Sequence, residues 1–563
     1  VGVNAQVISW EPVYATSKDS LVVYFDAAEG NAGLEGYSGD VYAHTGVITG
    51  ESISSGDWKY VKTDWGQNTA ETKLKRISSD YYEFKISPSI RDFYGVPEDE
   101  DILEIAFVFR SATASNNGSY FEGKTSEGGD IFLPLKYGFT IHQPVATPLF
   151  LNSNSSFDLV VEKVSIIDTM KLFIDNQLIL ETVDDSLNYS IAAESAGKHW
   201  VKLIGVIDSA TTAADSFYYF VHPEQVVKEL PEGIRPGINY LDMNTVVLNL
   251  YAPGKDFVYL LGDFNDWQVD EDYFMNVTPD SANYWIRLKY LTPMEEYGFQ
   301  YFVDGEIRIP DPYAEKILDP WNDQWIAEET YPDLKPYPTG KTDNIISVFQ
   351  TGQEEYNWIV EDFERPKKTD LVIYELLLRD FLAEHDYDAL IDTLGYLKQL
   401  GVNAIELMPV MEFEGNESWG YNPMMYFAPD KYYGTQEQLK QFIDAAHQDS
   451  IAVIFDLVLN HSYGLNPMVR LYFDKANNKP TAGNPWFNVV SPNPVFSWGY
   501  DFDHESEATK QFVDSVTTFW IEEYNIDGYR FDFTKGFTNT PGDGGAKDPA
   551  RIEILKRIAD HIW

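Results

Sequence analysis

The chain has 563 residues, and its 89 acidic against 41 basic residues give a formal net charge of −48 at pH 7. A surface of this sign repels phosphate backbones and anionic lipid headgroups, which argues against binding to nucleic acid or to a membrane surface. The absence of cysteine excludes disulfide scaffolds, cysteine-ligated metals and thiol nucleophiles, and no apolar run reaches the roughly 18 residues of a membrane-spanning helix.

Three β-rich modules are predicted first along the chain. Runs such as 20–25 (SLVVYF) and 103–109 (LEIAFVF) alternate with clusters of Gly, Asn, Ser and Asp, which predicts a β-sandwich over residues 1–136. Residues 137–226 repeat this pattern, and their short, regular strands predict an immunoglobulin-like sandwich that serves as a spacer. A third β-sandwich is predicted over residues 235–345.

The pattern changes over residues 366–563, where strand-like and helical runs alternate. Apolar runs at 371–376 (LVIYEL), 404–407 (AIEL) and 452–457 (AVIFDL) are separated by segments with apolar residues at helical spacing. This alternation predicts a parallel sheet. Because no Gly-x-Gly-x-x-Gly follows the first strand, a (β/α)8 TIM barrel is favoured over a dinucleotide-binding fold. About the first four strands of such a barrel are expected here, with a short loop domain after the third.

Polar side chains follow three of these predicted strands. A barrel strand that is apolar along its length and polar at its carboxyl end places the polar groups in the catalytic mouth. For one such end, a buried structural ion pair such as Asp456 with Arg530 is the simpler explanation, but three coordinated ends favour a site. The residues concerned are Trp419 and Tyr421 after the second strand, Asp456, Asn460 and His461 after the third, and Arg530 and Asp532 at the fourth.

Three motifs in this region resemble the α-amylase superfamily of retaining glycoside hydrolases. Residues 456–461 (DLVLNH) resemble the signature that ends the third barrel strand, and 528–535 (GYRFDFTK) the one that carries the nucleophile. Residues 419–423 (WGYNP) and 433–435 (YGT) resemble the loop after the second strand. The motifs occur in the family's order and spacing, and the resemblance extends over about 370–563.

The resemblance implies a role for each matched residue. Asp532 would be the nucleophile that forms a covalent glycosyl-enzyme. Arg530 would orient Asp532 and keep it ionised, since a neighbouring cation lowers a carboxyl pKa, and Asp456 would hold Arg530. The residues implied in substrate binding are His461, Tyr421, Lys535 and Trp419.

The resemblance also implies groups that the matched motifs do not complete. Asn460 resembles a calcium ligand of the family and Asp501 could be a second, but structural Ca²⁺ needs about 6–8 oxygen ligands. The family's general acid is a Glu at the end of the fifth strand, and neither Glu406 nor Glu412 matches it. We therefore expect the chain to be part of a longer protein, to need the remainder of the barrel as its partner, and to be inactive alone.

The β modules resemble domains that accompany such enzymes. The third module, with its run 259–267 (YLLGDFNDW), resembles the N-terminal sandwich of branching enzymes, isoamylases and pullulanases. The first resembles starch-binding sandwiches. The candidates for aromatic platforms that stack glucan rings are Trp58 and Trp65 in the first module and Trp267 in the third. Packing in a core is the alternative for each of them.

The resemblance implies a retaining hydrolase of α-1,4-glucosidic bonds in α-glucans such as starch, glycogen, pullulan or maltooligosaccharides, with no organic cofactor. A debranching or branching enzyme is the alternative, because the third module is frequent there, although Thr534-Lys535 resembles α-amylases more. From another class, a non-catalytic glucan-binding surface protein remains open. The acidity, the lack of cysteine and the surface-type modules favour a secreted or bacterial cell-surface location.

Overall fold

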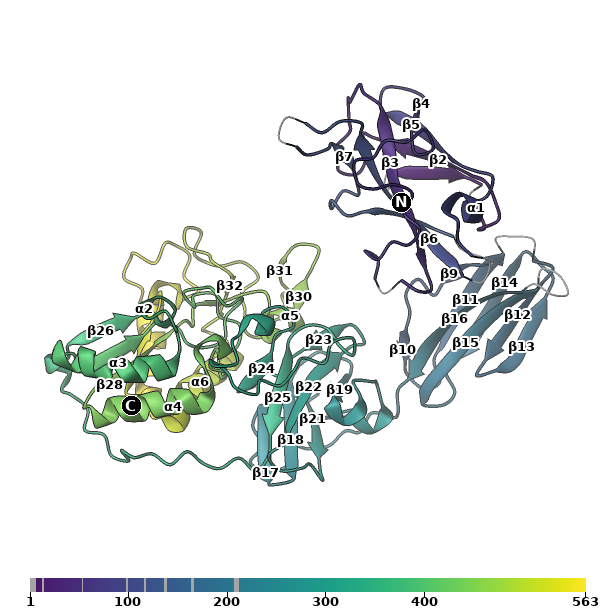
Figure 1. The fold of residues 1–563 in the computed structure, drawn as a ribbon. Coiled ribbons are helices and arrows are strands. Elements are labelled where there is room, and N and C mark those ends of the chain that lie inside the picture. Colours follow the sequence, from purple (N-terminus) through teal and green to yellow (C-terminus); the bar gives the residue numbers. More distant parts are fainter. Residues whose placement is uncertain are drawn as a thin grey trace. The chain divides into compact units, whose positions relative to one another are not determined.

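The chain forms two compact units, Val1–Val221 and His222–Trp563, drawn in purple to blue and in teal to yellow in Figure 1. No helix in the described part of either unit combines the length and apolarity that a membrane crossing requires. The computed structural model describes residues 7–12, 15–52, 54–97, 100–115, 118–135, 139–163, 167–206 and 212–563.

The first unit begins with two antiparallel sheets around an aromatic core. Alternate side chains of β2, namely Leu21, Val23 and Phe25, are buried, as the period of two of a half-buried strand requires. Phe25 stacks on Phe109 with ring centroids 4.2 Å apart. One sheet orders β1 (Ile8–Glu11), β2 (Leu21–Asp26), β5 (Tyr81–Ile86) and β4 (Lys75–Arg76); the other holds β3 (Val41–Thr49), β6 (Ile102–Ser111), β7 (Glu122–Gly123) and β8 (Ile131–Pro134), and α1 is Ile90–Tyr94.

Two further sheets in this unit form a second sandwich. Its larger sheet has one face in the core and one face open to solvent. Val201, Leu203 and Tyr219 are buried in the core, and Trp200, which precedes Val201 on β15, is exposed. The predicted boundary between the first two modules, at 136–137, lies outside the described residues. The larger sheet orders β10 (Leu149–Leu151), β16 (Thr212–Val221), β15 (Gly197–Val206), β12 (Thr169–Ile174) and β13 (Gln177–Thr182); the smaller orders β14 (Ser186–Ala192), β11 (Ser156–Lys163) and β9 (Phe139–Gln143).

The second unit begins with a further β-sandwich. Its strand β25 is buried and pairs with β22, and it carries the sheet to Gln350, past the boundary predicted at 345. One sheet orders β17 (Gly237–Asp242), β18 (Thr245–Tyr251), β21 (Asn283–Leu288) and β20 (Asn276–Val277); the other holds β19 (Val258–Gly262), β22 (Glu296–Val303), β25 (Ile346–Gln350) and β24 (Lys316–Leu318), with β23 (Ile307–Ile309) beside β22.

The prediction that Trp267 forms a glucan platform in this sandwich is wrong. Its side chain is 3% exposed, and its indole Nε1 donates to Asp263 Oδ1 at 3.1 Å. A Cβ built on Gly298 would lie only 3.2 Å from its ring. The ring therefore fills the core between the turn after β19 and strand β22, where no sugar can stack on it.

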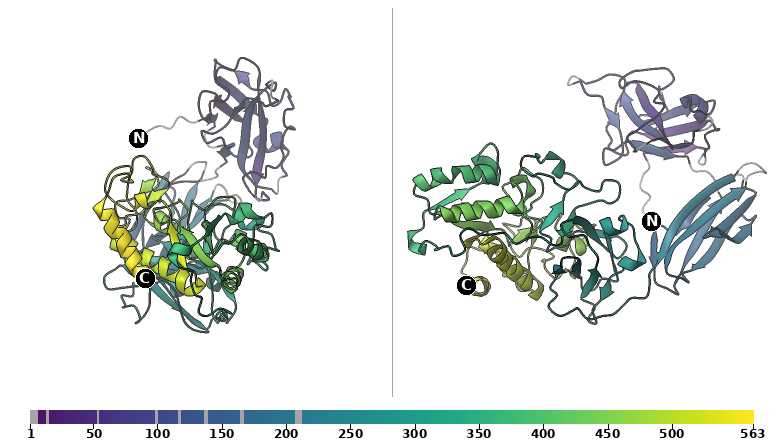
Figure 2. Two further views of the ribbon diagram at one scale, coloured as in Figure 1. Left: turned by 90° about the vertical axis from the view of Figure 1, so that its left-hand side faces the viewer. Right: turned by 60° about the horizontal axis from the view of Figure 1, so that its bottom comes forward.

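Four parallel strands follow the sandwich, paired in sequence order: β26 (Ile373–Leu376), β27 (Ala404–Leu407), β28 (Ala452–Leu457) and β33 (Gly528–Phe531). Helices alternate with them, and α3 and α4 pack side by side (Figures 1 and 2). The parallel βα alternation is as predicted, and closure into a barrel stays a prediction. The helices are α2 (Leu378–Phe381), α3 (Tyr387–Gln399), α4 (Gln436–Gln448), α5 (Pro467–Leu471), α6 (Glu507–Tyr524) and α7 (Pro549–Ile562).

Local signals in the sequence fix where these helices begin. Thr435 caps α4 by accepting from Gln438 N, and the Gln438 side chain accepts from Thr435 N in return, which satisfies two helix-terminal donors. Asp386 caps α3 by accepting from Ala389 N. Asp548 caps α7 and is followed by a proline. The long segment between β28 and α6 contains two short antiparallel strand pairs, β29 (His461–Ser462) with β32 (Tyr500–Asp501) and β30 (Phe473–Asp474) with β31 (Lys479–Pro480).

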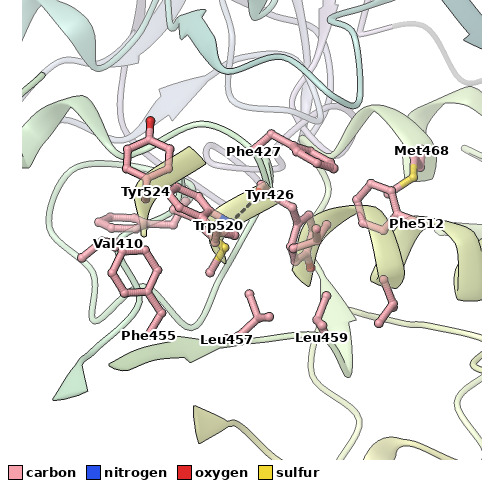
Figure 3. Packing of buried hydrophobic residues seen from close by; sticks show 14 of the residues in the cluster. Val410, Tyr426, Phe427, Phe455, Leu457, Leu459, Met468, Phe512, Trp520 and Tyr524 are labelled. Atoms are coloured by element: carbon pink, nitrogen blue, oxygen red, sulfur yellow. Dashed lines mark hydrogen bonds between the residues drawn. The ribbon is translucent and has the colours of Figure 1, made fainter. Parts of the chain in front are cut away.

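A core rich in aromatic residues packs against one side of β28 (Figure 3). Phe455 of this strand packs on Trp520 of α6 with ring centroids 5.2 Å apart, and Trp520 Nε1 donates to the carbonyl of Tyr426 at 2.9 Å. The same core includes the sandwich, since Tyr313 packs on Phe427 at 4.9 Å. The end of β28 is therefore held by rigid packing rather than by a loose loop.

A buried group of charges also ties the sandwich to the parallel-sheet part. Lys431 Nζ lies 3.2 Å from Asp323 Oδ1, which comes from the sandwich, and donates to Glu412 Oε1. Asp430 is buried beside them. We call these four residues the lysine cluster; desolvation makes such a group costly unless its charges remain paired.

Candidate active site

The candidate site is built on the carboxyl ends of β28 and β33. Asp456 and Arg530 are paired in register on these neighbouring parallel strands, and Asp532 comes two residues after Arg530, on the same face of its strand. Arg530 Nη1 donates to Asp456 Oδ1 at 2.9 Å, to Asp456 Oδ2 at 3.1 Å and to Asp532 Oδ1 at 2.6 Å. One guanidinium nitrogen thus bridges both carboxylates, and we call these three residues the arginine cluster.

The loop after β27 brings Tyr421 onto this cluster. The Tyr421 hydroxyl donates to Asp456 Oδ2 at 2.6 Å. Gly420, with φ of +86°, makes the approach possible, because a Cβ there would lie 2.6 Å from the carbonyl oxygen of Pro409. Asp456 is therefore fully occupied by Arg530 and Tyr421, and it positions them rather than meeting a substrate itself.

His461 is held against the same loop. Its Nε2 lies 2.9 Å from the carbonyl oxygen of Tyr421, so Nε2 carries the proton and donates. Its Nδ1 is buried without a hydrogen-bond partner among the described residues. Burial lowers the pKa of His461, although the Tyr421 carbonyl and Asp532 oppose this. The ring is therefore neutral at neutral pH and offers one unused acceptor.

Burial and charge set the protonation of the cluster. Burial raises the pKa of Asp456 to about 6, against the effects of Tyr421 and Arg530. Burial alone would lower the pKa of Arg530, but Asp456 and Asp532 together have the larger effect and raise it above its ordinary value. Glu406 Oε1 lies 3.8 Å from Arg530 Nε, and its pKa is raised by burial and by Glu375. Arg530 accordingly stays a cation throughout the physiological pH range.

An aromatic rim next to Asp532 was not predicted from the sequence. Phe533, which follows Asp532 in the left-handed region at φ of +41°, lies 5.0 Å from Trp498 and 5.6 Å from Phe496, measured between ring centroids. The Trp498 side chain is 48% exposed. The repeat of Trp-Gly-Tyr at 419–421 and 498–500 is a signal that could have found this rim.

The second Trp-Gly-Tyr is tied to the site by its glycine. A Cβ on Gly499, at φ of +55°, would lie 3.1 Å from His461 Cδ2 and 2.4 Å from the carbonyl oxygen of Ser462. Only glycine lets the strand pass so closely. Trp498 is therefore held near the histidine and the nucleophile candidate together.

The remaining predicted substrate contacts lie on open loops. Trp419 is 56% exposed and precedes Tyr421. Lys535 is exposed on the short turn 534–536 that follows Asp532. Neither side chain has a hydrogen bond or ion pair to another described residue, so both are available to a bound molecule.

The predicted calcium ligands lie close together without forming a calcium cage. Asp501 of β32 pairs with His461 of β29, beside Asn460. Among the described residues the buried Asn460 Oδ1 has no partner, which suits one ligand, but the Asp501 carboxylate already accepts from Asn488 and Ser491. The described part of the chain contains no group of three or more His, Cys, Asp or Glu residues placed to hold a metal. These donors do not fit Ca²⁺, and no step below depends on it.

The two tryptophans of the first unit differ in their environment. Trp65 is 47% exposed and meets the ring of His44 edge-on at 5.1 Å. Trp58 is half-buried, stacks on His44 at 5.6 Å and donates from Nε1 to the carbonyl of Ser55. A glucan platform at this place stays a prediction, and Trp65 is its more accessible half.

Comparison with known proteins finds a family that matches part of the chain. The family model described as the alpha amylase catalytic domain matches residues 361–498, which include Tyr421, Asp456 and His461. Over these residues the chain is similar to that family.

Relatives and one solved structure extend the likeness. A malto-oligosyltrehalose trehalohydrolase of Saccharolobus solfataricus is 29% identical over 330 residues, 57% of this chain and 48% of the relative. A 1,4-alpha-glucan branching enzyme of Picrophilus torridus is 28% identical over 338 residues, 56% of this chain and 42% of the relative. A solved putative alpha amylase from Salmonella typhimurium aligns at 25% identity and a TM-score of 0.42, over 58% of this chain and 47% of that one. The chain spans about half the length of the curated relatives it matches.

Proposed function

We propose that the protein containing this chain is a retaining glycoside hydrolase that cleaves α-1,4-glucosidic bonds in starch-like α-glucans. The bridge from Arg530 Nη1 to Asp456 and Asp532 is the observation that carries the proposal. It fixes one oxygen of Asp532 and leaves Oδ2 without a hydrogen-bond partner among the described residues. A carboxylate held in this way, with one oxygen free, is suited to attack at an anomeric carbon.

In the proposed reaction, Asp532 Oδ2 bonds to the anomeric carbon as the glycosidic C–O bond breaks, and water later releases the sugar with retention. The leaving oxygen needs a proton from a second carboxyl group about 5–5.5 Å from the nucleophile. Glu406 lies beside Arg530 and does not match the family's general acid. The resemblance to the family assigns the donation of this proton to a Glu at the end of a fifth strand.

Substrate contacts are proposed for the groups that the site leaves unpaired. His461 Nδ1 would accept from a sugar hydroxyl, and Lys535 would donate to one. Trp419 would stack on a pyranose ring, and the rim of Phe496, Trp498 and Phe533 extends the apolar surface for further rings. A secreted or cell-surface location belongs to the proposal and depends on none of these contacts.

A branching enzyme, which transfers the glycosyl group to a glucan hydroxyl instead of water, is the second candidate. The likeness to 1,4-alpha-glucan branching enzymes over 56% of the chain favours it. Both activities need the same nucleophile and differ in which acceptor reaches the glycosyl-enzyme. The arginine cluster therefore supports either of them.

Product analysis on amylose distinguishes these candidates. The hydrolase releases α-anomeric maltooligosaccharides and raises the reducing-end count, whereas the branching enzyme creates α-1,6 branch points at a nearly constant count. Pullulan cleavage at α-1,6 bonds would indicate a debranching enzyme. Glucan binding without any turnover by the full-length protein would refute both catalytic proposals and favour a non-catalytic binding protein.

A further inference from the structure

A cleft of about 700 Å³ separates the sandwich of the second unit from helix α4. Strands β17, β24 and β25 form one wall, and the start of α4, from Thr435 to Lys440, forms another. The volume lies within the roughly 300–1,000 Å³ of clefts that hold small molecules. None of the residues of the arginine cluster or the aromatic rim lines it.

A third wall is the segment that leaves β25 and runs towards the helices (Figure 1). Asp444 of α4 pins this segment by accepting from the backbone N–H groups of Ile359 and Val360 at 2.8 and 3.0 Å. Tyr356 beside them lines the cleft, and its hydroxyl lies 3.4 Å from Asp444 Oδ2. The cleft is therefore bounded on this side by ordered backbone held from α4.

Two tyrosine rings give the cleft its apolar surfaces. Tyr240 on β17 is 43% exposed and Tyr356 is half-buried, whereas Tyr331, which also lines the cleft, is only 8% exposed. Lys316 Nζ lies 4.9 Å from the centre of the Tyr331 ring and also donates to Glu296 Oε1 at 2.6 Å. Tyrosine rings offer flat faces on which the C–H face of a pyranose can stack, and their hydroxyls can bond to sugar hydroxyls.

Glu315 supplies a carboxyl group that no other described residue uses. Its backbone carbonyl accepts from Gln436 Nε2 at 2.5 Å, but its side chain has neither a hydrogen bond nor an ion pair. Lys440, the cation that lowers the pKa of Glu315, is already paired with Glu523. Burial and Glu523 raise the pKa of Glu315 to about 7, against Lys440. Near neutral pH this group can both donate to and accept from a hydroxyl.

The charges around the cleft select against anionic molecules. Its two lysines are each paired with a glutamate, so neither is free for a phosphate or carboxylate ligand. The acidic residues that line it are Glu296, Glu315, Asp333, Glu354, Glu355 and Glu437. The described residues also form no metal-binding group. A neutral molecule rich in hydroxyls is the class that these walls fit.

We propose that this cleft is a second, non-catalytic binding site for an α-glucan chain, built between the sandwich and α4. The choice of an α-glucan among neutral polyols rests on the proposed function, whereas the existence of a polyol site rests on the cleft itself. A glucan held here keeps further segments of the same chain near the catalytic cluster, which raises their effective concentration there.

The test measures hydrogen exchange of the full chain with and without maltoheptaose, in an Asp532→Asn background so that no turnover occurs. We expect slower exchange in peptides covering 350–360 and 435–440, by about threefold or more. Tyr240→Ala and Glu315→Gln should abolish this protection, and protection next to Asp532 should remain. The matched controls are Tyr290→Ala, whose side chain is 94% exposed, and Glu306→Gln, an exposed carboxylate away from the cleft; neither should change it.

The outcomes separate this proposal from the catalytic one. Turnover of amylose is measured separately in the protein with Asp532 intact. Protection of the cleft in the Asp532→Asn variant, together with no turnover by the protein with Asp532 intact, would sustain the binding site and refute the proposed function. Turnover by the intact protein without protection of the cleft at saturating maltoheptaose would overturn the binding site alone. Protection that survives both cleft variants would also overturn it, and equal protection by cellohexaose would overturn the assignment to α-glucans.

Discussion

Two groups of carboxylates around a cation occur in the second unit, and they differ mainly in access to solvent. In the arginine cluster, the Arg530 side chain is 39% exposed and Asp532 keeps one oxygen unpaired. In the lysine cluster, the Lys431 side chain is 4% exposed and is enclosed by Glu412, Asp430 and Asp323. Charge composition therefore does not distinguish the two clusters; the free oxygen of Asp532 in an open position does, and it is the feature on which the proposed nucleophile rests.

The comparison also explains the roles of the two cations. Arg530 orients two carboxylates at once through Nη1, with the Asp456 side chain buried and the Asp532 side chain still 21% exposed. Lys431 is a point charge in a closed space, where it balances carboxylates that would otherwise be buried unpaired. We expect removal of the first group to affect chemistry and removal of the second to affect folding.

The largest effect is expected from Asp532→Asn in the protein that contains this chain. The amide keeps the shape of the side chain but cannot form the glycosyl ester, so turnover on amylose should fall by about 10⁴-fold or more. Reducing-end release measures this, with the melting temperature as the control for folding. Hydrolysis within tenfold of the unchanged protein would remove Asp532 from the mechanism.

Lys431→Met should have the largest effect on stability. It leaves up to three buried carboxylates without their cation, which typically costs about 3–5 kcal/mol. Urea unfolding of the second unit measures the loss. The matched control is Lys398→Met, which breaks a half-exposed ion pair with Asp449 and should cost no more than about 1 kcal/mol. An equal loss of unfolding free energy in both variants would show that the burial of the lysine cluster does not increase its contribution to stability.

A smaller effect concerns pH. Burial raises the pKa of Glu412 and of Asp430, so the folded state binds these protons more tightly than the unfolded state. The resulting stability is present below the ordinary carboxyl pKa of about 4 and is lost as pH rises through the raised values, at about 1.4 kcal/mol per pKa unit. The unfolding free energy should therefore fall between pH 5 and pH 8.

Glu412→Gln should flatten that dependence, because the amide has no proton to lose. Glu384→Gln, at an exposed residue outside the lysine cluster, is the matched control and should leave the slope of the unchanged protein. A slope that Glu412→Gln does not alter would assign the pH dependence to other groups. Thermal melts at several pH values give both slopes.

The smallest effect tests whether the exposure of Trp65 reflects a role in glucan binding. Trp65→Ala should weaken binding to amylopectin by about three- to tenfold, since stacking on one ring is worth about 0.5–1.5 kcal/mol, and should barely change the melting temperature. Trp200→Ala, at an exposed tryptophan of the second sandwich, is the matched control. If both variants migrate like the unchanged protein in affinity electrophoresis, the platform at Trp65 does not exist.

The sequence predicts strands 404–407 and 452–457 with the bounds that the structure shows, because apolar runs between helical segments leave little freedom. It also predicts that Asp456, Arg530 and Asp532 meet, since parallel strands end at one edge of a sheet. Trp267 shows the limit: whether a turn tryptophan is buried depends on Gly298, which is distant in sequence. The cleft could not be predicted, because its walls at 240, 315 and 436 become neighbours only through tertiary packing.

The core shared by the sandwich and the parallel-sheet part limits how evolution can rearrange this chain. Tyr251 meets Trp486 at 5.7 Å, and Tyr313 contacts both Phe427 and Phe512. A recombination event that removed the sandwich of 237–350 would expose these apolar rings on the remaining part and leave its partner residues uncovered. We therefore expect this sandwich to be inherited together with the parallel-sheet part, whereas the two sandwiches of the first unit, each with its own core, can be gained or lost as separate modules.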